Sequence, residues 1–204
     1  MLIPLGNNCV ISWMNELVGI QQKTTPFEWF YSMKLSYITE IITRIEKSEI
    51  IDFSRIHYVP EVSKHDVHTY LLSSEKKMFS SHYRAIEFAS IFPRRYSRMI
   101  EEIKNNDILF FVRFNNSYPQ TLKVELENFI DCIHQINTKA VINFLLIDLG
   151  KKNTIILDKK LTNFYHEILP PDLFNYPVSR EMILNNTRLQ KIYMEMLEKI
   201  GYNK

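Results

Sequence analysis

Glycine is scarce in this sequence, with only four residues among 204. The phosphate-binding loops of nucleotide-binding proteins need several closely spaced glycines, as in the patterns GxGxxG and GxxxxGK(S/T). Neither pattern occurs in the chain. We therefore expect no nucleotide cofactor bound in the usual way, and the sequence predicts no other cofactor.

The chain also has few cysteines, a small net charge and no long apolar run. The two cysteines, Cys9 and Cys132, cannot form a disulfide framework. The formal net charge is only +2 and the two signs are interspersed, unlike the basic face of a nucleic-acid-binding protein. We find no signal segment and no apolar run of about 18 residues. The sequence therefore predicts a cytoplasmic protein with reduced cysteines that binds neither nucleic acid nor membrane, and it leaves the oligomeric state open.

Two nearly continuous apolar runs, at residues 108–114 and 141–149, indicate the fold class. An amphipathic helical pattern separates them, and strand, helix, strand is the order of a βαβ unit. Strands without polar alternation are covered on both faces. We therefore predict one α/β domain over residues 1–204, with a three-layer, Rossmann-like, mostly parallel sheet flanked by helices. In that sheet the two runs should be parallel neighbours or near neighbours.

Weaker patterns predict the remaining elements. The expected strands are residues 1–5, 56–59 and 67–72, with a short edge strand at 155–157. Proline and glycine mark several helix limits. The expected helices are one that ends at Gly19, one with an apolar stripe at 35–45, one at 92–104 that starts at Pro93, and one at 180–200 before Gly201.

The opening segment Leu5-Gly6-Asn7-Asn8-Cys9 is the most informative local pattern. Gly6 permits a tight turn from strand to helix, Asn7 or Asn8 is a natural N-cap, and Cys9 then falls in the first helical turn. Unpaired backbone N–H groups and the helix dipole lower the pKa of a thiol there from about 8.5 toward neutrality. The same N–H groups can hold an oxyanion. The alternative is a buried cysteine that fills a gap beneath the helix.

Three further residues are candidates for ligand binding. Arg113 ends the first apolar run, where a guanidinium must be paired or face a cleft. Arg94 opens a basic run at 94–98, which could bind an anion or form a solvated helix face. Asp148 lies at the carboxyl end of a central strand, where open α/β sheets bind ligands, although it could equally cap a loop.

The histidines include one candidate base. A cysteine nucleophile needs a base within hydrogen-bond reach, and His82 follows a short apolar segment from which it could project. His65 and His68 have a spacing of three residues, but a structural zinc site needs four ligands and no cysteine pair accompanies them. We therefore predict no metal site.

Five short motifs, taken in order over about residues 2–115, resemble a family of bacterial and viral proteins described as papain-like cysteine peptidases. That family shows an LGxxC element, a PFDW element, a histidine, an RRIxRF-like helix and an FVR strand. The corresponding segments here are Leu5-Gly6-Asn7-Asn8-Cys9, Pro26-Phe27-Glu28-Trp29, Ser81-His82-Tyr83, Arg94-Arg95-Tyr96-Ser97-Arg98-Met99-Ile100 and Leu109-Phe110-Phe111-Val112-Arg113.

The resemblance implies roles for four of these residues. Cys9 would be the nucleophile and His82 its base, Glu28 takes the place of the family's aspartate, and Arg113 that of its strand-end arginine. A papain-like protein would have an α+β fold with an antiparallel sheet, which is the alternative to the parallel sheet that the apolar runs predict.

Three functions of different classes fit the sequence. The first is a cysteine-dependent hydrolase or acyl transferase that uses Cys9 and His82 on a peptide or small-molecule acyl substrate, with Asn8, Glu28, Arg94, Arg113 and Asp148 as candidate binding residues. The second is a glycan-related or other group-transfer enzyme in which Arg113 and Arg94 bind an anionic donor and Cys9 is structural. The third is a non-catalytic interaction module with Trp29, Phe30 and Tyr31 as exposed aromatics.

Overall fold

The computed structural model describes most of the chain at the level of the backbone. Outside the described residues lie 1, 7–8, 21–24, 29, 31–33, 50–55, 59–67, 72–76, 81–84, 116–120, 150–154, 156, 158, 175–177 and 204, together with the side chains of 56–58, 68–71, 77–80 and 85–89.

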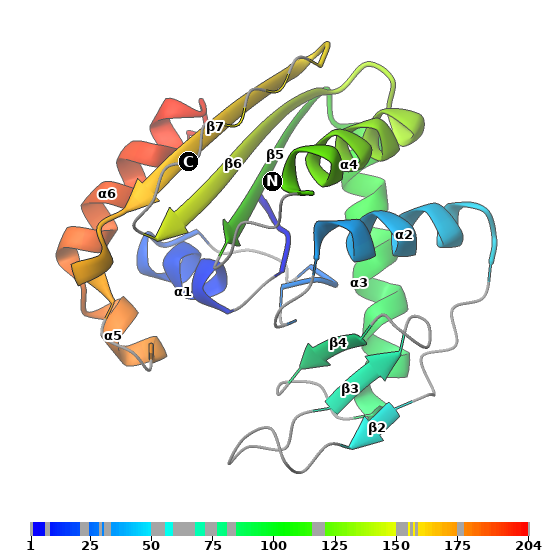
Figure 1. Ribbon diagram of the computed structural model, residues 1–204, viewed down its shortest axis with the longest axis horizontal. Helices are drawn as coiled ribbons and strands as arrows, with labels where there is room; N and C mark the ends of the chain where they lie inside the picture. The colour runs from blue at the N-terminus through cyan, green and yellow to red at the C-terminus, as the bar shows by residue number, and fades with distance from the viewer. Residues whose placement is uncertain are drawn as a thin grey trace.

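A four-stranded, all-parallel sheet forms the centre of the molecule (Figure 1). Its strands, in spatial order, are β1 (Leu2–Pro4), β5 (Ile108–Asn115), β6 (Val141–Leu149) and β7 (Thr162–Leu169). β5 and β6 are the two apolar runs, and they pair in parallel over their whole length, with Ile108 opposite Val141 and Asn115 opposite Asp148. The predicted parallel neighbours are therefore confirmed.

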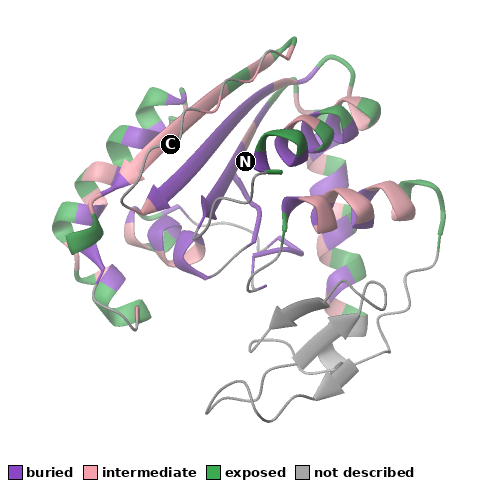
Figure 2. Ribbon diagram, viewed as in Figure 1, coloured by how far each residue is buried: buried purple, intermediate pink, exposed green. Residues whose placement is uncertain are grey.

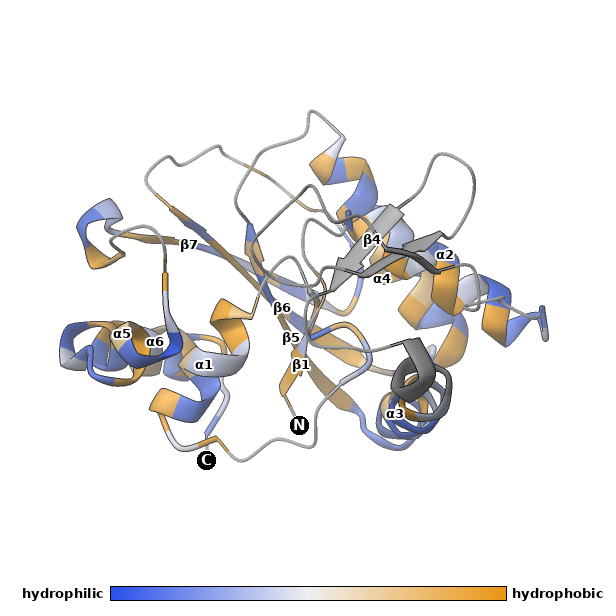
Figure 3. Ribbon diagram, turned by 90° about the horizontal axis from the view of Figure 1, so that it is seen from below, coloured by the Kyte–Doolittle hydropathy of each residue, from blue (hydrophilic) through white to orange (hydrophobic). Residues whose placement is uncertain are grey.

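Helices cover both faces of this sheet, as the absence of polar alternation in β5 and β6 requires. On one face lie α2 (Leu35–Glu46), α3 (Ala85–Asn105) and α4 (Leu122–Ile136), and on the other lie α1 (Val10–Leu17), α5 (Arg180–Leu184) and α6 (Thr187–Lys199). The view along the sheet in Figure 3 shows the two groups of helices on opposite sides of it. This is the three-layer, Rossmann-like α/β arrangement that the sequence predicts.

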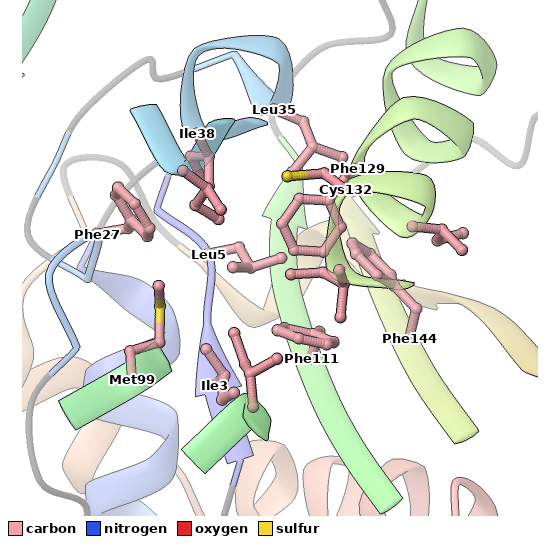
Figure 4. Close-up of a cluster of buried hydrophobic side chains, with 14 of the residues drawn as sticks. Ile3, Leu5, Phe27, Leu35, Ile38, Met99, Phe111, Phe129, Cys132 and Phe144 are labelled. Atoms are coloured by element: carbon pink, nitrogen blue, oxygen red, sulfur yellow. The ribbon is translucent and has the colours of Figure 1, made fainter. Parts of the chain in front are cut away.

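Each face of the sheet has its own hydrophobic core (Figure 2). The first core lies under α2, α3 and α4, where Phe111, Phe129 and Phe144 meet with ring centroids 5.2 to 6.4 Å apart (Figure 4). The second core lies under α1, α5 and α6 and includes Val112, Leu145 and Tyr193. Because side chains of a strand alternate between faces, the core to which a residue belongs also assigns a face to its neighbours.

A second sheet of three antiparallel strands is formed by β2 (Ile56–Tyr58), β3 (His68–Leu71) and β4 (Lys77–Ser80). β2 and β3 confirm the predicted strands near 56–59 and 67–72, whereas β4 was not expected. Figure 1 places this small sheet beside the beginning of α3, away from the larger sheet.

Three other expectations were wrong in detail. α3 begins at Ala85 rather than at Pro93, which lies inside the helix; a proline removes only one backbone hydrogen bond, and the buried face of the long helix offsets this loss. The predicted helix at 180–200 is two helices, because Asn186 caps α6 and ends the continuity of the chain. The fourth strand is β7, not 155–157; Ile155 and Leu157 instead pack against the first core.

None of the described helices is both long enough and apolar enough to cross a lipid bilayer.

Candidate functional site

Buried polar side chains collect where the four parallel strands end, which is the edge at which α/β sheets bind ligands. The described residues of this kind are Thr25, Glu28, Arg113, Asn115, Glu125 and Asp148. Burying polar groups is costly unless each is paired, so their concentration at one edge of the sheet identifies it as the candidate site.

Cys9 lies at this edge, directly between β1 and α1. Gly6 has a φ of 59°, in the region that favours glycine, and this lets the chain turn sharply after the strand. Cys9 is itself the N-cap of α1: its carbonyl accepts the first helical hydrogen bond, from Trp13 N at 3.1 Å. The helix therefore starts one or two residues later than predicted, while the cysteine still adjoins the N–H groups of the first turn, which make no hydrogen bond within the helix. Its side chain is buried, with 4% exposure.

Glu28 is close to the same turn, on a segment that folds back over β1. The Thr25 hydroxyl donates to the carbonyl of Pro4, the last residue of β1, and the Thr25 N–H donates to Glu28 Oε2 at 3.1 Å. Burial raises the pKa of Glu28 above 4.5, and the nearby Ser12 hydroxyl, the Thr25 N–H and the charges of Arg95 and Arg98 oppose this rise. Ser12 is one helical turn after Cys9, so the carboxyl group adjoins the start of α1.

Arg113 connects β5 to the end of β1. Its Nη1 donates to the backbone carbonyl of Leu5 at 2.6 Å, and the charge of Glu125, in the first turn of α4, acts on its guanidinium. Complete burial lowers the pKa of Arg113 to about 10, and the Glu125 carboxylate opposes that change. Glu125 in turn accepts from Ser36 N and Thr121 Oγ1. The sequence predicts that Arg113 is paired or faces a cleft, and in the structure it is hydrogen-bonded to the Leu5 carbonyl.

Asp148 is the second-last residue of the central strand β6 and pairs with His166 of β7, whose Nε2 lies 2.5 Å from Asp148 Oδ2. Both side chains are almost fully buried, with 2% and 6% exposure. The sequence pattern indicates Asp148 but not His166, because β7 mixes polar and apolar residues without a clear period. Asn115, opposite Asp148, was also missed, although a polar residue at the end of an apolar run was the available signal.

The remaining candidates are distributed as follows. Arg94 is exposed on α3, and it is Arg95 and Arg98 of the same helix whose charges act on Glu28. His82 and Asn8 lie outside the described residues. Phe30 is fully buried and so is unavailable as an exposed aromatic of an interaction surface; Trp29 and Tyr31 lie outside the described residues. Within the described part of the chain, no three histidine, cysteine, aspartate or glutamate side chains are grouped so as to hold a metal ion.

Four of the five motifs therefore meet around the end of β1: the turn that carries Cys9, the segment with Glu28, the basic face of α3 and the end of β5 with Arg113. Asp148 lies farther away, because β5 separates β6 from β1.

Comparisons of the chain with protein-family models, with curated proteins and with solved structures give no match.

Proposed function

We propose that this protein is a cysteine-dependent hydrolase or acyl transferase in which Cys9 is the nucleophile and His82 the base. The observation that carries the proposal is the position of Cys9, at the N-cap of α1 and at the carboxyl end of β1, with Glu28 and Arg113 around the same turn. This position combines the helix dipole with N–H donors beside the sulfur.

The reaction follows from these groups. His82 takes the thiol proton, and the sulfur of Cys9 attacks the carbonyl carbon of an amide, peptide, isopeptide or thioester. The carbonyl electrons move to the oxygen, which the N–H groups at the start of α1 stabilise. When the carbonyl re-forms, the leaving group departs with the proton from His82 and leaves a thioester on Cys9. Water or an acceptor nucleophile then releases the acyl group.

Glu28 and Arg113 are positioning residues in this scheme. Thr25 bonds to Pro4 through its hydroxyl and to Glu28 through its N–H, while Arg113 bonds to the Leu5 carbonyl. These hydrogen bonds fix the carbonyls of Pro4 and Leu5 at the end of β1. Because the Gly6 turn follows directly, they also fix the point from which the chain enters α1. A turn held in this way orients the sulfur and the N–H groups before substrate binds.

The test measures the reactivity of the Cys9 thiol. Iodoacetamide labelling of the native Cys132→Ser variant should titrate with an apparent pKa clearly below the ordinary cysteine value of about 8.5. Cys132 is the matched control, examined in Cys9→Ser: it is buried between α2 and α4, its pKa is raised by burial, and it should label slowly. Cys9→Ala should also abolish acyl-enzyme formation, detected by mass spectrometry, with thioester substrates.

Two results would contradict the proposal. Because Cys9 is 4% exposed, labelling also measures access to its sulfur. Labelling only after denaturation would show that Cys9 is a buried filler. A native titration like that of free cysteine would show that the helix start does not activate it.

A further inference from the structure

Asn115, Asp148 and His166 form a second polar cluster, at the carboxyl ends of β5, β6 and β7. Asn115 lies directly opposite Asp148 in the parallel register. Asp148 lies opposite Ile168, so His166 is diagonal to it across the next strand pair, and their side chains meet at 2.5 Å. Three neighbouring strands thus each contribute one polar side chain.

These side chains share one face of the sheet. Phe111, Phe144 and Phe164 belong to or pack against the first core, under α4. Asn115, Asp148 and His166 follow them by four, four and two residues, and residues an even number apart in a strand point to the same side. The cluster therefore continues the first core toward the strand ends, beside the first turn of α4, where Glu125 lies near Arg113.

One donor of the cluster is not satisfied within the described part of the chain. Asn115 is 3% exposed, and its Nδ2 has no hydrogen-bond partner among the described residues. A buried amide N–H without a partner is costly, and native proteins rarely retain one without a reason. Asp148 and His166 are in contact with each other, and the Glu125 carboxylate acts electrostatically on Arg113.

We propose that this cluster binds a neutral ligand that carries hydroxyl groups, such as a polyol or sugar. A hydroxyl oxygen of the ligand accepts from Asn115 Nδ2, and the O–H of the same hydroxyl donates toward the Asp148 carboxylate, which contacts the His166 imidazole. A carboxylate or phosphate would face the Asp148 carboxylate, and Arg113, whose charge Glu125 counteracts, would not offset the cost of burying a further anion.

The His166 end of the cluster lies away from the Cys9 site, whereas Asn115 lies on β5, the neighbour of β1. β7 is the fourth strand and β1 the first, so about 14 Å of sheet lies between them at the usual spacing of parallel strands. His166 is therefore not the base for Cys9, and the ligand site stands or falls independently of the proposed hydrolase.

The experiment follows the side-chain NH₂ signals of Asn115 and the imidazole signals of His166 by NMR. The full-length isotope-labelled protein is titrated separately with glycerol, glucose and sodium acetate. The polyols should shift both sets of signals saturably, and acetate should not. In Asn115→Leu the response of His166 should weaken about tenfold, as expected for the loss of one hydrogen bond. The matched control is Asn163→Leu, an exposed residue near the start of β7, which should keep the response.

Three outcomes would overturn the proposal: no saturable shift with either polyol, an equal response in Asn115→Leu, or a saturable response to acetate, which would identify an anion site instead. The titration of the unmodified protein is decisive even if Asn115→Leu does not fold.

Discussion

The guanidinium of Arg113 and the backbone carbonyl of Leu5 are joined by a hydrogen bond of 2.6 Å, although 107 residues separate them along the chain. This bond continues the pairing of β1 with β5 beyond its last register pair, Pro4 with Val112. It therefore holds the residue that leads into the Gly6 turn and so supports the position of Cys9.

Replacing Arg113 should destabilise the protein strongly. Arg113→Met removes the donor to the Leu5 carbonyl and the positive charge on which Glu125 acts, and the loss of a hydrogen bond made by a charged group costs about 1.5–3 kcal/mol. Urea unfolding measures the change. Arg94→Met, on the exposed face of α3, is the matched control and should stay within about 0.5 kcal/mol of the parent protein. Equal effects of the two substitutions would show that the buried contact contributes nothing.

Glu28 should make stability depend on pH. Burial raises its pKa above the ordinary 4.5, so between the unfolded and folded pKa values the folded state binds more protons and the free energy of unfolding falls as pH rises. Glu28→Gln removes this dependence. The stability of the parent relative to the variant should therefore be greatest below the unfolded pKa and decline as pH rises through the folded pKa. Unfolding curves across this range measure it.

The exposed Glu195→Gln on α6 is the control for Glu28, and its difference from the parent should not show this decline. A parent protein that instead gains stability over Glu28→Gln as pH rises would mean that Arg95 and Arg98 dominate over burial.

His82 should activate Cys9 if it is the base. His82→Ala removes the imidazolium that favours the thiolate, so the apparent pKa of Cys9 labelling should rise while the thermal unfolding midpoint is unchanged. His134→Ala is the control, since that residue lies on α4 with its Nε2 3.2 Å from the Ala140 carbonyl oxygen. An unchanged titration in His82→Ala would remove His82 from the mechanism and leave Cys9 without an assigned base.

Asn186 should stabilise the start of α6. Its side chain accepts from the Leu189 N–H, and its Nδ2 donates to the Leu173 carbonyl. Asn186→Ala should cost about 1 kcal/mol in the free energy of unfolding, as is usual for the loss of an N-cap. Asn185→Ala, at the adjacent C-cap of α5, should cost clearly less. Similar losses at both positions would show that the cap does not determine where α6 begins.

The local sequence pattern was sufficient to predict the elements that have a continuous apolar run or stripe. The apolar runs of β5 and β6 and the helical stripe of α4 each need one particular partner layer, so their order along the chain predicts a parallel βαβ unit. Gly6 and the apolar positions after Cys9 likewise predict a turn followed by a helix, with an error of one or two residues in its start. The same apolar runs predict that Arg113 and Asp148 lie at strand ends, where buried polar residues collect.

Tertiary structure alone decided which of these residues meet. The pairing of Asp148 with His166, the position of Asn115 opposite Asp148 and the approach of Arg95 and Arg98 to Glu28 depend on strand register and helix placement. Neither strand register nor helix placement can be predicted from the local sequence. A half-polar strand such as β7 has no recognisable period. α3 continues through Pro93 because the packing of the helix outweighs one lost hydrogen bond. The sequence by itself thus determined the layers of the fold and the position of Cys9 at a helix start. Contacts between side chains that are distant along the chain determined which polar residues gather near Cys9 and which form the cluster of Asn115, Asp148 and His166.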